Sequence, residues 1–288
     1  MGGAASDRLA TVTEHVLIIG IDGVRLDVLT EEPTPHLDEL ADRGFLAPVR
    51  VNEAAPTISG PSWATILTGA LADRHLIMDN DLSPNGLAAH PDVLRLAATQ
   101  RPEVARFAAA GWAPIVTDDS GGPLLADGGF FPPGRQAHLP HQWTRADQAV
   151  TDATVRFLHD HDGSHGSLVF CYLGGVDEVG HLLGVAQQYR RFVRDSDTRV
   201  GQLLAALAAR PAEERWTVLV ATDHGHVLAG GHGGDSPEER TAWIVAAGTD
   251  VPTTAPARLE QADVAGHTLH LLDLTPPTGT YGVRFGAR

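Results

Sequence analysis

Three short apolar runs that each lead to an aspartate place the strongest constraint on how this chain can fold. The runs and the acids that follow them are 16–21 with Asp22, 167–173 with Asp177, and 218–222 with Asp223. Short apolar runs rich in β-branched and aromatic residues are typical of buried strands. Because ligands of open α/β sheets bind beyond the carboxyl ends of the strands, we expect the three carboxylates to meet at one edge of a sheet.

Three histidines accompany these acids: His181, His224 and His232. The first lies one helical turn after Asp177, so that the two side chains share a face. The second directly follows Asp223, and the third is flanked by glycines, which leave a loop histidine accessible. Carboxylate and imidazole are ligands for zinc and similar ions. Together with Asp22, these residues predict a two-metal site, in which ions about 4 Å apart clamp the attacking and leaving oxygens of a phosphoryl transfer.

Ser59 is the candidate nucleophile. It lies in a tight turn that contains two prolines and a glycine, just before an expected helix over 62–68. The free N–H groups at the start of a helix attract anions, and metal coordination deprotonates a serine that is unreactive at its ordinary pKa. Taken alone, this serine fits an ordinary turn or helix cap better than a nucleophile. The neighbouring acids and histidines carry the prediction.

Strands and helices alternate along the chain, which predicts a mostly parallel central sheet with helices on both faces, a three-layer α/β/α fold. We expect one domain over 1–288. Further strands are expected at 45–51, 112–117, 242–247 and 280–285, and helices at 35–44, 91–110, 147–161, 187–209 and 264–272. The segment 118–145 is rich in glycine, proline and histidine and is long for a structureless loop, so we expect a small insertion or lid there.

Composition excludes several classes of function. With 21 basic and 36 acidic residues the net charge is −15, which argues against binding to a nucleic-acid polymer or an anionic membrane surface. All 21 basic residues are arginines, which excludes a P-loop lysine, a Schiff-base lysine and a lysine general base. The single cysteine, Cys171, cannot form an internal disulfide, and we expect a cytoplasmic protein without a membrane helix.

In their order along the chain, these segments resemble the motifs of the alkaline phosphatase superfamily, and most closely its nucleotide pyrophosphatase/phosphodiesterase branch. The matching segments are 21–25, 34–37, 56–61, 67–69, 73–80, 177–181, 222–225 and 231–233. The resemblance implies one zinc ion held by Asp177, His181 and His232. It implies a second zinc ion held by Asp22, Asp223, His224 and the Ser59 oxygen. Manganese or iron would also suit these ligands.

The resemblance further implies that Asn80 and the backbone N–H of Gly60 hold a non-bridging phosphate oxygen, where charge develops during the reaction. It implies in-line attack by the Ser59 alkoxide and a covalent phosphoserine that water then hydrolyses. Two positions depart from the branch, which usually has threonine where Ser59 stands and asparagine where Ser62 stands. Both departures bear on the substrate class.

We therefore expect a two-metal hydrolase of small-molecule phosphate esters, with phosphodiesters or nucleotide pyrophosphates favoured. The first alternative is a phosphomonoesterase or phosphonate hydrolase on the same scaffold. Further alternatives are a phosphomutase and a metal-binding protein without catalysis, although related mutases use lysine in their phosphate clamps. Phe130, Phe131 and Trp143 could stack a nucleobase, but they fit the core of the insertion better. His226 is a candidate to support a metal ligand from behind.

Overall fold

Six strands form one sheet in the order β2-β6-β5-β1-β4-β3 in the computed structural model, which describes residues 13–133 and 139–288. They are β1 (Thr13–Ile21), β2 (Phe45–Arg50), β3 (Ala105–Ala110), β4 (Ser167–Leu173), β5 (Glu214–Ala221) and β6 (Thr241–Ala247). Neighbouring strands are parallel from β3 through β4 and β1 to β5, whereas β6 runs antiparallel to β5 and β2. The mostly parallel sheet predicted from the sequence is confirmed.

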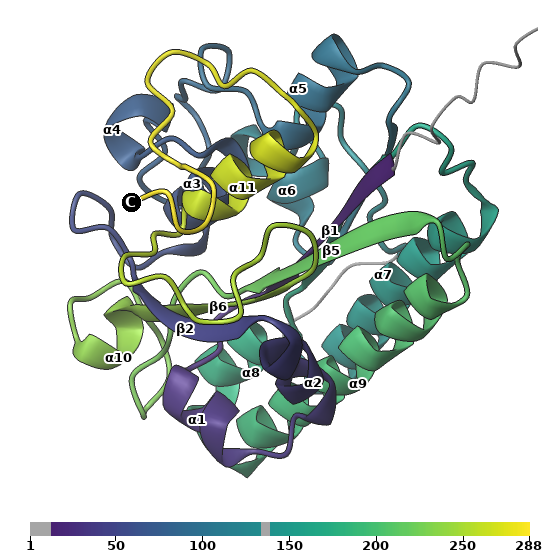
Figure 1. Ribbon diagram of the computed structural model, residues 1–288. Coiled ribbons are helices and arrows are strands. Elements are labelled where there is room, and N and C mark those ends of the chain that lie inside the picture. The colour runs from purple at the N-terminus through teal and green to yellow at the C-terminus, as the bar shows by residue number, and fades with distance from the viewer. Residues whose placement is uncertain (1–12, 134–138) are drawn as a thin grey trace, which may run out of the picture.

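Helices cover both faces of this sheet (Figure 1). One face carries α3 (Ser59–Thr68), α5 (Val93–Gln100), α6 (Ala113–Val116) and α11 (Asp263–Leu271). The other face carries α1 (Leu26–Glu31), α2 (Pro35–Arg43), α7 (Pro140–Asp160), α8 (Gly175–Leu183) and α9 (Gln187–Ala208). The short elements α4 (Ala72–His75), η1 (Asp119–Gly121) and α10 (Pro237–Arg240) lie in the connections. No helix in the described ranges is long and apolar enough to cross a membrane.

The strand β1 lies inside the sheet and contributes side chains to both hydrophobic cores. Val16 and Ile18 pack with Trp63 in the core under α3, while Leu17 and Ile19 belong to the core on the opposite face. All five side chains are fully buried. A parallel strand that is buried on both faces has a continuous apolar sequence, which is why the apolar runs located β1, β4 and β5.

Two expectations for the region before α7 were wrong. Residues 105–110, expected to be helical, form the strand β3, which pairs in parallel with β4. Residues 112–117, expected to be a strand, contain the one-turn helix α6, with Pro114 in its first turn. The alanine-rich sequence of β3 favours a helix locally, but the hydrogen bonds to β4 override that weak preference.

The expected last strand over 280–285 was also wrong. The N–H groups of Tyr281 and Gly282 both donate to the carbonyl of Gly69, at 2.8 and 2.9 Å. The segment therefore closes over the C-terminal end of α3 and stays outside the sheet.

The expected insertion over 118–145 stays a prediction, because residues 134–138 lie outside the described part of the chain. Within the described part, Leu124 and Leu125 are buried in the core beside α3. Phe130 exchanges backbone hydrogen bonds with the edge strand β3, and Trp143 is buried in the first turn of α7. Both side chains pack in the hydrophobic core of the main domain, which includes Val169 and Phe192, whereas the sequence predicted that they form a core of the insertion itself.

Candidate metal centre and nucleophile

The carboxyl ends of β1, β4 and β5 bring three aspartates to one edge of the sheet. Asp22 and Asp223 follow β1 and β5 within two residues, and Asp177 lies in the first turn of α8, directly after β4. The side chains of Asp22 and Asp223 are at most 1% exposed, and that of Asp177 is 12% exposed. Carboxylates buried this close together repel each other unless a positive charge lies among them.

Two donors hold the Asp22 carboxylate and leave one of its oxygens unpaired. Trp63 Nε1 donates to Oδ2 at 2.8 Å, and the Tyr172 hydroxyl donates to the same oxygen at 2.5 Å. The other oxygen, Oδ1, is buried and has no hydrogen-bond partner among the described residues. Burial, together with the carboxylates of Asp223 and Asp177, raises the pKa of Asp22 well above its ordinary value. A buried carboxylate oxygen that accepts no hydrogen bond from a described residue is well suited to bind a metal ion.

Asp223 and His224 place further possible ligand atoms opposite Asp22 Oδ1. Asp223 Oδ1 accepts the N–H of Gly23 at 3.0 Å, whereas its Oδ2 has no hydrogen bond from a described residue. His224 Nδ1 donates to the carbonyl of Gly225 at 3.1 Å. The other ring nitrogen, Nε2, faces Asp223 Oδ2 at 3.0 Å and Asp22 Oδ1 at 3.8 Å.

The negative charge of these carboxylates attracts positive charge to the site. Burial alone would lower the pKa of His224, but the carboxylate of Asp223 outweighs it and raises this pKa to about 10. A divalent ion meets the same electrostatic need and leaves the imidazole neutral, as a metal ligand must be. We call Asp22, Asp223 and His224 the Asp22 group.

Asp177, His181 and His232 form a second set, the Asp177 group. His181 Nε2 lies 3.5 Å from Asp177 Oδ2 and 2.9 Å from His232 Nε2, which in turn lies 3.4 Å from Asp177 Oδ1. His232 Nδ1 donates to the carbonyl of Thr57 at 2.7 Å, so that its Nε2 is an acceptor. Burial, with a contribution from His224, lowers the pKa of His232 to about 3 and keeps the ring neutral. The His181 side chain is 46% exposed, so this group opens to solvent.

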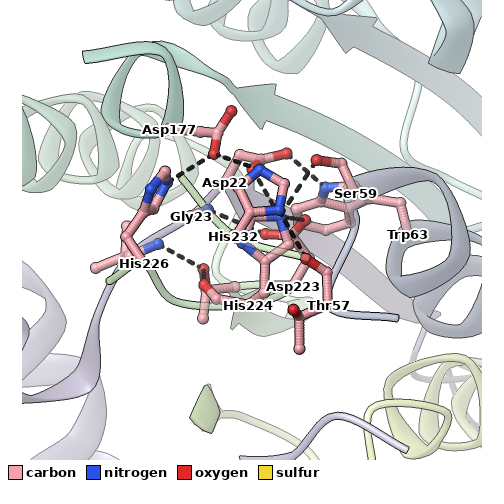
Figure 2. Close-up of polar contacts among 12 residues, drawn as sticks. Asp22, Gly23, Thr57, Ser59, Trp63, Asp177, Asp223, His224, His226 and His232 are labelled. Atoms are coloured by element: carbon pink, nitrogen blue, oxygen red, sulfur yellow. Dashed lines mark hydrogen bonds and ion pairs between the residues drawn. The ribbon is translucent and has the colours of Figure 1, made fainter. Parts of the chain in front are cut away.

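The two groups lie next to each other (Figure 2). Ligand atoms of the Asp22 group all lie within 4.8 Å of one another, and so do those of Asp177, His224, His226 and His232. The rings of His224 and His232 stack with their centroids 3.7 Å apart. The sequence-predicted ligands therefore converge on one place from four separate parts of the chain.

Ser59, at the start of α3, lies beside the predicted metal ligands. Its Oγ lies 3.3 Å from His224 Nε2, and the residue is only 5% exposed. The helix begins at Ser59 itself, three residues before the start expected from the sequence. A Cβ on Gly60 would lie 2.1 Å from the carbonyl oxygen of Asp79, so only glycine lets the 79–80 segment approach the nucleophile this closely.

Asn80 and the N–H of Gly60 also lie beside Ser59, but they bond to each other. The Gly60 N–H donates to Asn80 Oδ1 at 2.9 Å. A phosphate oxygen would replace Asn80 Oδ1 as the acceptor of this N–H, and rotation of the amide would turn its NH₂ group toward the same oxygen. The two predicted phosphate donors are thus adjacent in this structure, and the Gly60 N–H already has an acceptor in Asn80 Oδ1.

Several residues that organise the site were not predicted from the sequence: Thr57, Trp63, Tyr172 and Asp147. Asp147 in α7 accepts the N–H groups of Gly174 and Gly175 at 3.0 and 3.1 Å, and so anchors the start of the helix that carries Asp177. Trp63 lies one helical turn after Ser59, a spacing that could have placed it at the site. Tyr172 and Asp147 carry no comparable local signal.

Comparisons with known proteins find both similar sequences and similar structures. Residues 16–231 match the family model for type I phosphodiesterases / nucleotide pyrophosphatases. The chain is 24% identical over 237 residues to an uncharacterized pyrophosphatase/phosphodiesterase of Schizosaccharomyces pombe, covering 78% of this chain and 47% of that protein. It is 26% identical over 244 residues to human ectonucleotide pyrophosphatase/phosphodiesterase family member 7, covering 77% and 50%. The chain thus spans about half the length of these curated relatives.

Solved structures share the fold. Murine ectonucleotide pyrophosphatase/phosphodiesterase 5, solved as an inactive variant in complex with AMP, gives a TM-score of 0.64 at 17% identity, covering 92% of this chain and 96% of that chain. A 2-O GAG sulfatase gives a TM-score of 0.74 at 15% identity and covers 94% of this chain and 73% of that chain. At these identities, the likeness establishes a common architecture and leaves the chemistry to the site residues.

Proposed function

Because this chain belongs to the type I phosphodiesterase/nucleotide pyrophosphatase family, which is hydrolytic, we propose that it cleaves small phosphodiesters or nucleotide pyrophosphates with two metal ions and Ser59 as the nucleophile. One observation carries this proposal: Ser59 Oγ lies 3.3 Å from His224 Nε2, which itself faces the unpaired oxygens of Asp22 and Asp223. A serine beside converging carboxylate and imidazole ligands fits metal activation.

The donor atoms fit two divalent ions. The Asp22 group with Ser59 Oγ would hold one ion, and the Asp177 group would hold the other. The clearest sign of this fit is that the buried oxygens Asp22 Oδ1 and Asp223 Oδ2 accept no hydrogen bond from a described residue. Bound ions supply positive charge to a phosphate and activate a hydroxyl and a water at neutral pH. Mixed oxygen and nitrogen ligands favour zinc, although manganese or iron would also suit them.

Within that frame, the residues of the chain have defined roles. Ser59 Oγ attacks the phosphorus in line with the leaving group, so an O–P bond to Ser59 forms as the ester bond breaks. Water then attacks the same phosphorus, the bond to Ser59 breaks, and the remaining monoester leaves. The N–H of Gly60 and the amide of Asn80 hold a non-bridging oxygen, where negative charge gathers.

The guanidinium of Arg25, which follows the Asp22 motif, is already occupied by partners within the protein. Its Nε and Nη2 donate to the Asp27 carboxylate at 2.9 and 2.6 Å, and its Nη1 donates to the carbonyl of His226 at 2.9 Å. A phosphate monoester carries one more charge than a diester, and a bidentate arginine is a strong partner for that extra charge. Arg25 is therefore not free to supply it. The AMP bound by the murine structural neighbour makes nucleotide esters the first natural substrates to test.

Turnover of bis(4-nitrophenyl) phosphate and 4-nitrophenyl phosphate, measured side by side, tests this function. We expect a higher kcat/KM for the diester and loss of turnover in Ser59→Ala, with about two metal ions per chain retained. A large preference for the monoester would overturn the substrate order. Activity that survives in Ser59→Ala would overturn the nucleophile, and isomerised product without free phosphate or monoester would point to a mutase. The cytoplasmic location stays a prediction.

A further inference from the structure

His226 is buried directly behind the metal-ligand groups (Figure 2). Its Nε2 lies 2.8 Å from Asp177 Oδ1, and its Nδ1 accepts the N–H of Gly231 at 3.1 Å. A ring nitrogen that accepts a hydrogen bond carries no proton, so Nε2 carries it and donates to Asp177. Protein groups therefore use both nitrogens of this ring.

In this use of both ring nitrogens, His226 differs from His224 and His232, which were predicted as ligands. His224 and His232 each use Nδ1 on a backbone carbonyl and keep Nε2 for the site. That division of the two nitrogens is usual for a histidine bound to a metal. His226 lies within 4.8 Å of other ligand-type atoms, but it has no nitrogen to spare. If it bound an ion through either nitrogen, it would leave a buried hydrogen-bonding partner without its bond, which is unfavourable.

Two glycines make room for the His226 ring. A Cβ on Gly180 would lie 2.8, 2.9 and 3.1 Å from three ring atoms, and a Cβ on Gly23 would lie 2.8 Å from Nε2. Gly180 is inside α8, between Asp177 and His181, where a glycine stabilises the helix less than an alanine would. The helix α8, which carries the predicted ligands Asp177 and His181, therefore needs a glycine at position 180 to pack against the His226 ring.

We propose that His226 is a positioning residue that aims two ligands of the same metal ion. Through Nε2 it fixes the carboxylate of Asp177, and through Nδ1 it fixes the loop that ends in His232, one residue after Gly231. This role rests on the two-metal site proposed above. Arg25 Nη1 holds the carbonyl of His226 at 2.9 Å, so the ring itself is anchored from the far side. The Asp22 group has no bond to this ring and keeps its own supports, Trp63 and Tyr172.

Three variants test this role. His226→Ala removes both bonds. His226→Gln places an amide nitrogen near the position of Nε2, so it can still donate to Asp177. His267→Ala is the matched control, because His267 is also fully buried and its Nδ1 accepts a backbone N–H, from Phe285 at 3.4 Å, but it lies in α11. Titration of metal-free protein with zinc, in competition with a chromogenic chelator, gives the two dissociation constants without any turnover.

We expect His226→Ala to weaken one of the two zinc sites by about 10–100-fold, the usual effect of losing a partner of a metal ligand, and to leave the other unchanged. His226→Gln should recover most of that loss. His267→Ala should lower the thermal midpoint and leave both zinc constants at their wild-type values.

Other results would overturn the role. They are unchanged zinc constants in His226→Ala, equal weakening of both sites, or loss of a whole zinc equivalent in His226→Gln as well as His226→Ala. The last result would make His226 a ligand. If the wild-type chain bound no zinc, manganese or iron, the proposed two-metal function would fail and this inference with it, whereas the other failures would leave that function standing.

Discussion

Replacing Asp147 by asparagine should make the protein gain stability relative to the wild type as the pH rises. The Asp147 carboxylate is wholly buried and accepts the N–H groups of Gly174 and Gly175 at 3.0 and 3.1 Å. Burial raises the pKa of Asp147 to about 6, although Arg199 and the two N–H groups oppose the rise. The folded protein therefore holds this proton more tightly than the unfolded chain does.

The pKa of Asp147 gives the size of the effect. An aspartate in an unfolded chain has a pKa of about 3.9, so the folded and unfolded values differ by about two pH units, or about 3 kcal/mol. Because the folded pKa is the higher one, this stabilisation is complete below about pH 4. It is lost as the pH rises through about 6. Asparagine has no proton to lose, and the one N–H it cannot accept costs a pH-independent amount of about 1–3 kcal/mol.

Urea unfolding of both metal-free proteins at several pH values measures the effect. The free energy of unfolding of Asp147→Asn minus that of the wild type should rise by about 3 kcal/mol between about pH 4 and pH 7. Groups that titrate in both proteins, including the carboxylates of the site, cancel in this difference. A difference that stays constant or falls with pH would show that Arg199 and the two N–H groups outweigh burial.

Other changes test single parts of the site. Asn80→Ala should lower kcat for the nitrophenyl diester by about 100–1,000-fold with metal content unchanged, because a donor to the developing charge is lost; a wild-type kcat would remove Asn80 from the mechanism. Gly180→Ala should push the His226 ring and weaken zinc binding despite the better helix propensity of alanine; zinc constants equal to those of the wild type would contradict the close packing. Trp63→Phe removes one of two donors to Asp22 Oδ2, which costs about 1.5–3 kcal/mol for a charged acceptor, and the loss should appear as weaker zinc binding in the Asp22 group alone.

The predicted ligands could be located from the sequence because each one has a local signal. Asp22 directly follows the buried apolar run of β1, and Asp223 follows that of β5 after one residue, Thr222. His181 lies one helical turn after Asp177, so that both side chains are on the same face of the helix. Parallel strands then bring these short local patterns together at one edge, so their convergence needed only the fold class.

The groups that hold the ligands could not be located in this way. Trp63, Tyr172 and Asp147 reach their partners across 41, 150 and 27 residues of sequence. From the sequence alone, Asp147 in the middle of an amphipathic helix is expected to be solvated. Only the packing of α7 against α8 shows that it is buried. The strand β3 was missed for a related reason, since its alanines favour a helix and only the pairing with β4 makes it a strand.

Anomalous diffraction from crystals grown with zinc tests the two-metal site most directly. We predict two peaks, one bounded by Asp177, His181 and His232, and one bounded by Asp22, Asp223 and His224 with the Ser59 oxygen as a further ligand. His226 should lie outside both ligand sets, with its ring still on Asp177. A single peak, or peaks that leave the Asp22 group or Ser59 without an ion, would contradict the two-metal mechanism.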